Sequence, residues 1–469
     1  MAAAAANEKA GMSTLAANEK AGMSTLPVAQ WLSTPYGGPV ARLGTQLFSR
    51  QQWQQEVTAL GHRLLAHPAR RWALCFDDSY LFSVALLAAL HAGKVPVIPG
   101  HCRESLLQEQ SSEFDAVLTD GWFTLNSPIL QLPLSANAEA SCYSALPALS
   151  SDAFVVLFTS GSTGAPRQVI KPVRCLDAEA RCLAEYWVDR LAGCTVIATV
   201  SHQHLYGLTF RLILPLALGQ PFDCRQILYS EQLSALADSE DYVLISSPAF
   251  LRRLDLTLPA PRCKLIVSAG GELPWSCAQE VNSWLKQPVE EIYGSTETGV
   301  LAVRSRTSEK QLWQPFDGVN FSQDAQQRWW ARSPLIPGQQ GLQLDDKLAF
   351  TSAGFQLGGR YDRTVKVEDK RVSLSEIERR LLALPQVMDV VALAVRRPER
   401  SGIGVVLVLD ADYDEKTLAQ MKREWRQELC RWLEPVAIPR YWRIVNSIPH
   451  NSQSKRAWPQ IEELFYAAR

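Results

Sequence analysis

Short apolar runs bounded by glycine, proline or polar residues recur along the first two thirds of the chain. They read RWALCF, KVPVIPG, DAVLTD, FVVLFTSG, TVIATVS, YVLISSP and KLIVSAGG, and helix-like stretches separate several of them. A continuous apolar run of this length is typical of a strand that is buried on both faces, and strands that alternate with helices are typical of parallel sheets. The pattern therefore predicts an α/β fold with largely parallel sheets.

Three of these runs change from apolar to small polar residues at their ends, at Thr159, Ser246 and Ser268. In open α/β sheets, ligands bind beyond the carboxyl ends of the strands. We therefore expect ligand binding or catalysis near these three positions, taken together. For any one of them alone, an ordinary tight turn is the better interpretation.

The pattern changes after Gly359. The segment RVSLSEIERRLLAL places Ser373 three residues before Glu376, which predicts a capping box at the start of an amphipathic helix. VMDVVALAV and GIGVVLVLDA read as strands, and one face of a further helix is marked by Leu418, Met421, Trp425, Leu429 and Trp432. We expect a large domain over residues 27–360 and a small α+β domain over residues 361–469.

Composition and charge narrow the class of protein. The chain has 469 residues, of which 47% are hydrophobic and 20% charged, and a net charge of −1. These values predict a globular protein of two or three domains, and they argue against one whose main task is to coat nucleic acid. The ten cysteines show no C-x-x-C pair. Disulfide frameworks and structural zinc are therefore poor interpretations, and we expect reduced thiols in the cytoplasm.

The N-terminal segment does not predict a signal peptide, and the apolar stretches do not predict a membrane span. The sequence AANEKAGMSTL occurs twice in tandem, over residues 5–15 and 16–26, without the basic leader or apolar core of a secretory signal. We expect this tail, residues 1–26, to have no part in function, and folding to begin near Pro27. The longest apolar stretches fall short of the ~20 residues that a transmembrane helix needs.

The segment VVLFTSGSTGAPRQVIKP raises the question of a phosphate site. An apolar strand that runs into Gly, Ser and Thr residues can direct backbone N–H groups at an anion. The P-loop of nucleoside triphosphatases is excluded, because Gly161 and Gly164 are too close together and no G-K-[ST] follows. Arg167 and Lys171 favour anion binding over a flexible linker, but this segment alone does not decide between them.

Four segments carry a family resemblance: FTSGSTGAPRQVIK, EIYGSTETG, GGRYDRTVKVEDKRVSLSEIE and IPHNSQSKR. In this order they resemble the signature set of the adenylate-forming superfamily, which includes acyl-CoA synthetases and nonribosomal adenylation domains. Within it, the chain looks most similar to acyl or aryl synthetases of arylpolyene-type bacterial clusters. The resemblance implies a large N-terminal adenylate-forming domain of layered sheets and helices, followed by a small mobile α+β lid.

The resemblance also implies an activity. Such enzymes use ATP and Mg²⁺ to activate an aryl or fatty carboxylic acid as an acyl-adenylate, release pyrophosphate, and transfer the acyl group to a pantetheine thiol. We expect the thiol of an acyl carrier protein, because Asp369 stands where relatives have a glycine beside the pantetheine tunnel. A ligase that uses free coenzyme A is one alternative. Others are a catalytically idle scaffold that binds nucleotide or carrier protein, and a luciferase-like oxidase on the same fold.

The first two motifs suggest a nucleotide site. The resemblance assigns Thr296 to the α-phosphate and Glu297 to Mg²⁺, and it places Gly270 and Gly271 beside the adenine and acyl pockets. Arg167 stands where the family usually has Lys, which keeps the charge but changes the hydrogen-bond geometry. The remaining nucleotide-binding residues implied by these motifs are Thr159, Ser160, Gly161, Ser162, Thr163, Gly164, Tyr293, Gly294 and Ser295.

The later motifs complete the predicted site. The resemblance makes Asp346, with Asp345 as the alternative, and Arg360 the ribose contacts. It makes Asp362 the hinge of the lid and Lys455 the catalytic cation of adenylation, although Asn451 and Ser454 depart from the usual Thr and Gly of that motif. His204 is the predicted gate of the acyl pocket and Tyr206 its wall, for which a packed core His and Tyr are an equally good interpretation; His202 is less attractive as the gate.

Overall fold

The structure of the protein is a computed structural model. It describes residues 24–34, 37–100, 102–134, 144–160, 166–236, 238–338, 340–360, 364–367, 370–395, 402–431, 433, 435–451 and 456–466. These residues form two compact units. The first holds the residues up to Asn320 together with Arg332–Leu342, and the second holds Phe321–Ala331 together with the residues from Gln343 onward.

The first unit contains a six-stranded sheet. Its order is β6 (Ile129–Gln131), β5 (Ala116–Thr119), β3 (Arg71–Cys75), β4 (Val95–Ile98), β7 (Phe154–Ser160) and β8 (Pro166–Pro172). All neighbours pair in parallel except β7 and β8, which form an antiparallel hairpin. The hairpin therefore lies at one edge of this sheet, and its connection is the predicted phosphate loop.

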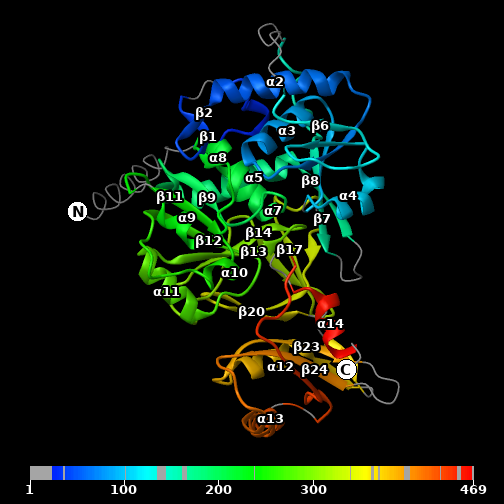
Figure 1. The fold of residues 1–469 in the computed structure, drawn as a ribbon, viewed down its shortest axis with the longest axis vertical. Coiled ribbons are helices and arrows are strands. Elements are labelled where there is room, and N and C mark those ends of the chain that lie inside the picture. Colours follow the sequence, from blue (N-terminus) through cyan, green and yellow to red (C-terminus); the bar gives the residue numbers. More distant parts are fainter. Residues whose placement is uncertain are drawn as a thin grey trace, which may run out of the picture. The chain divides into compact units, whose positions relative to one another are not determined.

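The first unit also contains a nine-stranded sheet (Figure 1). Its order is β15 (Gln314–Pro315), β14 (Gly299–Ser305), β13 (Val289–Ser295), β12 (Cys263–Ser268), β11 (Tyr242–Ser246), β9 (Thr195–Ala198), β10 (Phe222–Asp223), β1 (Pro39–Leu43) and β2 (Gln46–Ser49). The strands from β13 to β1 run parallel, and antiparallel pairs close both ends of the sheet.

Buried helices fill the space between the two sheets, and Figure 1 shows α3, α5 and α8 between their strands. Helix α3 is buried along nearly its whole length, because its sequence SYLFSVALLAALH has no polar face. The main core of the unit joins side chains from these helices to both sheets. The helical segments of the unit are η1 (Val28–Gln30), α2 (Arg50–Ala66), α3 (Ser79–His91), α4 (Glu104–Glu109), η2 (Ser111–Glu113), α5 (Val173–Tyr186), α6 (Val188–Leu191), α7 (Leu205–Gly207), the π-helical η3 (Leu208–Ile213), α8 (Leu214–Leu218), α9 (Ser230–Ser234), α10 (Pro248–Leu251) and α11 (Trp275–Leu285).

The second unit begins with short strands and continues as a small α+β fold. Its elements are β16 (Asn320–Gln323), β17 (Trp329–Arg332), β18 (Leu342–Gln343), β19 (Asp346–Thr351), β20 (Gly354–Arg360), β21 (Thr364–Val367), β22 (Lys370–Ser373), α12 (Leu374–Leu382), β23 (Val387–Val395), β24 (Gly402–Leu409), α13 (Glu415–Cys430), η5 (Pro435–Ala437), β25 (Tyr441–Ile444) and α14 (Trp458–Tyr466). The outermost residues of β16, β17 and β18 fall in the first unit. Its two longest strands, β23 and β24, form a three-stranded sheet with β25, in the order β23-β24-β25.

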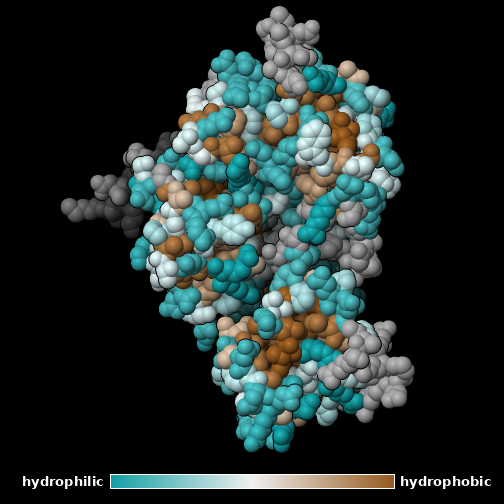
Figure 2. Space-filling view, in the orientation of Figure 1, coloured by the Kyte–Doolittle hydropathy of each residue, from teal (hydrophilic) through white to brown (hydrophobic). Residues whose placement is uncertain are grey.

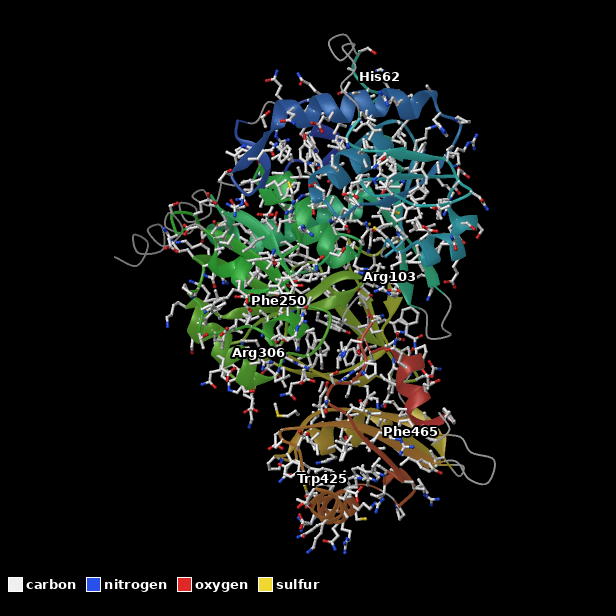
Figure 3. The ribbon with its side chains drawn as sticks, viewed as in Figure 1. His62, Arg103, Phe250, Arg306, Trp425 and Phe465 are labelled. Atoms are coloured by element: carbon white, nitrogen blue, oxygen red, sulfur yellow. The ribbon has the colours of Figure 1, made fainter. Side chains whose placement is uncertain are left out.

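Both faces of this sheet are covered. Alternate residues of β23 contribute to two separate apolar clusters, one with Trp425 of α13 and the other with Phe465 of α14. Figure 3 shows these two side chains on opposite sides of the sheet. Figure 2 shows in addition a hydrophobic area on the surface of this unit.

The predicted fold class is confirmed. All seven apolar runs of the first part became strands, and those in each sheet run parallel to one another as expected. The Oγ of Ser373 accepts a hydrogen bond from the Glu376 amide at 3.2 Å, so the predicted helix cap forms, while the Glu376 carboxylate pairs with Arg379 and Arg380. The domain boundary predicted at residue 360 stays a prediction. Among the described residues, no helix is long and apolar enough to cross a membrane.

Candidate active site

Four neighbouring parallel strands of the nine-stranded sheet end at the same edge. These are β9, β11, β12 and β13, and Ser246 at the end of β11 lies opposite Ser268 at the end of β12. The segments that follow these strands carry the predicted gate His204, the glycines 270 and 271, and the YGSTETG turn. The sheet therefore gathers at one edge residues that are far apart in the sequence.

The strand that leads into the predicted phosphate loop contacts the turn that carries the predicted metal ligand. The Oγ1 of Thr159, near the end of β7, lies 3.5 Å from the Oε1 of Glu297, 138 residues further along the chain. Thr159 also lies opposite Arg167 on β8. Residues 161–165 and the side chain of Ser160 lie outside the described residues. Within the described part, the two predicted nucleotide motifs therefore meet at this contact.

The turn between β13 and β14 has a geometry that requires glycine at both ends. A Cβ on Gly294 would lie 2.2 Å from the Gly299 carbonyl oxygen, and Gly299 has φ = 69°. Ser295 and Thr298 close the turn, since the Oγ1 of Thr298 accepts from the Ser295 amide at 2.9 Å. The turn thereby fixes the backbone of Thr296 and Glu297, whose side chains are half-buried.

A buried lysine lies behind this turn. The Nζ of Lys171 donates to the Glu297 carbonyl oxygen at 3.2 Å, and the residue is only 1% exposed. Burial lowers the pKa of Lys171, an effect opposed by the negative charges of Glu179 and Glu297 and by Cys175. The sequence analysis gave Lys171 no role beyond favouring an anion. Its position two residues after buried Val169, on the inward face of β8, was the signal that a charge would be buried there.

A buried carboxylate accompanies the lysine. Glu179 of α5 is 2% exposed, and its two oxygens accept from the Val300 amide at 2.7 Å and from the Thr209 hydroxyl at 2.8 Å. The sequence analysis missed this residue. It stands on the apolar face of α5, among Leu176, Ala180 and Leu183, and a charged residue on such a face is expected to have buried partners.

Tyr293, one of the predicted nucleotide-binding residues, has an aromatic neighbour that the sequence analysis also missed. The rings of Tyr293 and Trp313 are 6.0 Å apart in an edge-on arrangement, and the Arg304 guanidinium lies 4.5 Å from the Trp313 ring centre. Such contacts restrict where the Tyr293 ring can lie. Gly270 has φ = 95°, a conformation that favours glycine, and a Cβ on Gly271 would meet only Pro248, at 3.9 Å.

The hydroxyl of Tyr206 joins the ends of two strands. It lies 3.0 Å from the carbonyl oxygens of both Ser246 and Val267, and its ring packs against Phe210 with centres 4.9 Å apart. Burial raises the pKa of Tyr206. The hydroxyl of Ser268 is also buried, and it has no hydrogen-bond partner among the described residues. Phe250 (Figure 3) belongs to α10, which follows directly after β11.

The two histidines of SHQH differ in their surroundings. His202 is buried, with Nε2 3.0 Å from the Phe76 carbonyl oxygen and Nδ1 2.9 Å from the Ser79 hydroxyl. A carbonyl only accepts, so Nε2 carries the proton and Nδ1 accepts from Ser79. Burial lowers the pKa of His202 well below its usual value. His202 is thus a neutral core residue, whereas His204 is half-buried and immediately precedes α7.

The remaining predicted residues belong to the second unit. Asp346 and Arg360, the predicted ribose contacts, lie opposite each other on the antiparallel strands β19 and β20, and Asp345 is exposed. The predicted hinge Asp362 and the predicted catalytic Lys455 lie outside the described residues. Arg456, the residue after Lys455, forms a two-point ion pair with Asp389, with N–O distances of 2.9 and 2.5 Å.

Comparison with known families places these features in context. The model of the family described as AMP-binding enzyme matches residues 39–321. The chain is 27% identical over 318 residues to a 4-coumarate–CoA ligase of Rhodobacter capsulatus, an alignment that covers 67% of this chain and 77% of that protein. It is 22% identical over 477 residues to surfactin synthase subunit 2 of Bacillus subtilis, covering 87% of this chain but 13% of that much longer protein.

Solved structures share the fold over nearly the whole chain. ATP-bound MatB from Rhodopseudomonas palustris superposes with a TM-score of 0.76 at 17% identity, covering 94% of this chain and 99% of that one. The o-succinylbenzoate–CoA synthetase MenE of Bacillus subtilis, in complex with its acyl-adenylate intermediate, gives a TM-score of 0.75 at 17% identity, covering 95% and 99%. At such identities the likeness establishes the fold.

Proposed function

The chain belongs to the AMP-binding enzyme family, and we propose from this premise that it is an acid–thiol ligase that works in two half-reactions. In the first, a carboxylic acid attacks the α-phosphorus of ATP, which gives an acyl-adenylate and pyrophosphate. In the second, a pantetheine thiol takes the acyl group and AMP leaves. The observation that carries the proposal is the contact between Thr159 and Glu297, because it joins the two motifs that would hold the triphosphate.

The residues at this contact suit a nucleotide with a divalent cation. Mg²⁺ binds one or two carboxylates and completes its ligands with phosphate oxygens and water. Glu297 offers one half-buried carboxylate beside the hydroxyl of Thr159, so the donor set fits. Glu297 would hold the metal, which when bound offsets the negative charge of the triphosphate. The hydroxyl of Thr296 would donate to the α-phosphate, and Arg167 would add a positive charge near the phosphate loop.

Further residues would orient the rest of the substrates. We assign the ribose to Asp346 and Arg360, the adenine to Tyr293 with Gly270, Gly271, Gly294 and Ser295, and the β- and γ-phosphates to Ser160, Gly161, Ser162, Thr163 and Gly164. Lys455 would steady the carboxylate and the α-phosphate during adenylation. The lid, residues 361–469, would then turn about Asp362 for the second half-reaction. Because Tyr206 is tied to two strand ends, it would form a fixed wall of the acyl pocket with His204 at its entrance.

For the acceptor we propose the phosphopantetheine arm of an acyl carrier protein, with an aryl or fatty acid as the acyl donor. The carboxylate of Asp369 in VKVEDKR would repel the phosphates of free coenzyme A more than it would affect a carrier-bound arm. The rival is a ligase that uses free coenzyme A. One relative favours this rival, since it is named as a 4-coumarate–CoA ligase.

The first test is acid-dependent exchange of pyrophosphate into ATP over a panel of aryl and fatty acids. We expect exchange with at least one acid, and a loss of about 10²-fold in Glu297→Gln, the scale of removing one group that stabilises a transition-state charge. Glu280→Gln, which changes an exposed carboxylate on α11, is the matched control and should leave exchange unchanged. Folded protein that binds ATP but exchanges with no acid would favour the idle scaffold.

The acceptor is tested separately. With the acid found by exchange, kcat/KM is measured for coenzyme A and for a cognate carrier protein that bears the phosphopantetheine arm. A clear preference for the carrier supports the proposal, and a clear preference for coenzyme A refutes it.

A further inference from the structure

Two buried side chains of opposite charge, Lys171 and Glu179, lie behind the turn that carries Glu297. The two residues are close together in the sequence. Lys171 is near the end of β8, and Glu179 is in α5, which follows β8 without a loop. Each contacts the backbone of the turn rather than its side chains: Lys171 the carbonyl of Glu297, and Glu179 the amide of Val300. These residues have no part in the assignments made above.

The β7–β8 hairpin determines where the lysine points. Residues opposite each other in an antiparallel pair share a face, and side chains alternate along each strand. Thr159 lies opposite Arg167, and Lys171 lies opposite Val155, so Thr159 and Lys171 are on the same face. Thr159 contacts the Glu297 carboxylate, and Lys171 donates to the Glu297 carbonyl oxygen. The phosphate-loop hairpin thus holds this residue at two points.

Glu179 fixes the other end of the turn. Its Oε1 accepts from the Val300 amide, and a Cβ added to Gly299 would lie 2.8 Å from the same oxygen. Its Oε2 is held by Thr209 of η3. The carboxylate therefore lies closely against the backbone where β14 begins, and there is little room for the turn to move toward α5.

We propose that Lys171 and Glu179 are positioning residues that set the place of the Glu297 carboxylate relative to the phosphate loop. The inference rests on the proposed function, in which Glu297 holds the metal of MgATP. A neutral hydrogen-bonding pair would satisfy the same two backbone groups without the cost of burying two charges. The ammonium adds a positive charge beside a turn that is to bind an anionic nucleotide, and Glu179 balances that charge while the site is empty.

The test compares Lys171→Met, which keeps the length of the side chain without its charge, with the wild-type protein. The measurements are the dissociation constant of MgATP by calorimetry without any acid, the KM values of ATP and of the acid, the Mg²⁺ concentration for half-maximal exchange, and the melting temperature. We expect the MgATP constants and the Mg²⁺ requirement to rise about tenfold, the scale of losing one hydrogen bond to a charged group, with the acid KM changed less than twofold.

Two further variants sharpen the result. Lys171→Arg keeps the charge and should restore much of the MgATP affinity. Ile170→Thr changes the exposed neighbour on the opposite face of β8 and should leave every value unchanged. If Lys171→Met does not fold, Glu179→Gln removes the other charge at constant shape, and it should show the same separation between ATP and acid constants.

A folded Lys171→Met whose melting temperature falls while the constants for MgATP and Mg²⁺ stay at wild-type values would overturn the inference, because that is the result of a merely structural role. The same conclusion holds for Glu179→Gln if it is the variant that folds. Wild-type protein that binds MgATP but shows no pyrophosphate exchange with any acid would refute the proposed ligase activity. The present inference would then be decided by the binding data alone. Wild-type protein that does not bind MgATP overturns both.

Discussion

A methyl group at Gly294 is the sharpest test of the turn that carries Glu297. Gly294 lies where the register of β13 and β14 shifts, and a Cβ there would be 2.2 Å from the Gly299 carbonyl oxygen and 3.1 Å from the Val300 Cα. An ordinary contact is about 3.5–4.0 Å, so the first of these distances is too short by more than 1 Å. The obstacle is backbone on a neighbouring strand, which has no alternative rotamer, so in Gly294→Ala the two strands must move apart by about that distance.

The displacement has two expected costs. Overpacking of this kind destabilises a protein by about 1–3 kcal/mol, which corresponds to a fall of roughly 2–4 °C in Tm for each kcal/mol in a domain of this size. A displacement of about 1 Å in a group that positions substrate can cost about 10²-fold in rate. Because the turn carries Thr296 and Glu297, we expect Gly294→Ala to lose far more exchange activity than its stability loss explains.

The assay is pyrophosphate exchange at saturating ATP and acid, well below the Tm of the variant, together with thermal unfolding of the same preparation. Gly37→Ala is the matched control, since a Cβ at that position would meet nothing within 4 Å, and it should change neither value. Gly294→Ala with wild-type Tm and exchange would refute the argument, because the strands would then have accommodated the methyl group without moving the turn.

Three further predictions concern His202, Tyr206 and Lys455. His202→Gln should remove a pH dependence of stability. Burial depresses the folded pKa of His202, so the stability that its neutral ring provides is fully present above the unfolded pKa of about 6.5. This stability is lost as the pH falls below that value. The Tm difference between wild type and this variant should therefore grow between pH 5 and 7, and a constant difference would contradict it. Tyr206→Phe removes the hydroxyl that joins β11 and β12 and should raise the acid KM by up to about tenfold with the ATP KM unchanged; steady-state kinetics that show equal changes in both would count against an acyl-pocket role. Lys455→Ala should slow adenylate formation by about 10²-fold yet spare acyl transfer from preformed adenylate, and equal losses in the two half-reactions, measured separately, would exclude a lid that carries Lys455 away.

The sequence by itself determined the strands and the faces of the helices. The central residues of a run such as TVIATVS or KLIVSAGG are apolar without alternation, which is typical of a strand buried on both faces. The buried face of α13 carries Met421, Trp425 and Leu429, as their spacing predicts. Ser373 caps α12 because its hydroxyl accepts from the Glu376 amide only three residues further along the chain. These are local effects, which depend only on residues that are near in the chain.

The motifs named the residues of the candidate site, but not the buried residues that support them. Thr159 and Glu297 were named from their motifs, and the structure brings them together. Lys171, Glu179 and Trp313 were not, although each contacts a predicted residue or its backbone. Their positions in the sequence indicated at most burial, for a lysine on the inward face of a strand and a glutamate on the apolar face of a helix, and nothing near them indicated the partners that they meet.

Only the tertiary structure decided which of these ordinary residues meet the site. The contact of Lys171 with Glu297 spans 126 residues, and that of Glu179 with Val300 spans 121. Such a contact depends on how the six-stranded and nine-stranded sheets share one core, and no period or spacing along the chain encodes that arrangement. The same holds for His202, which a pattern cannot distinguish from His204. Phe76, Ser79 and Phe82 bury the ring of His202, which makes it a neutral core residue, whereas His204 is half-buried, because burial depends on which elements meet around a side chain.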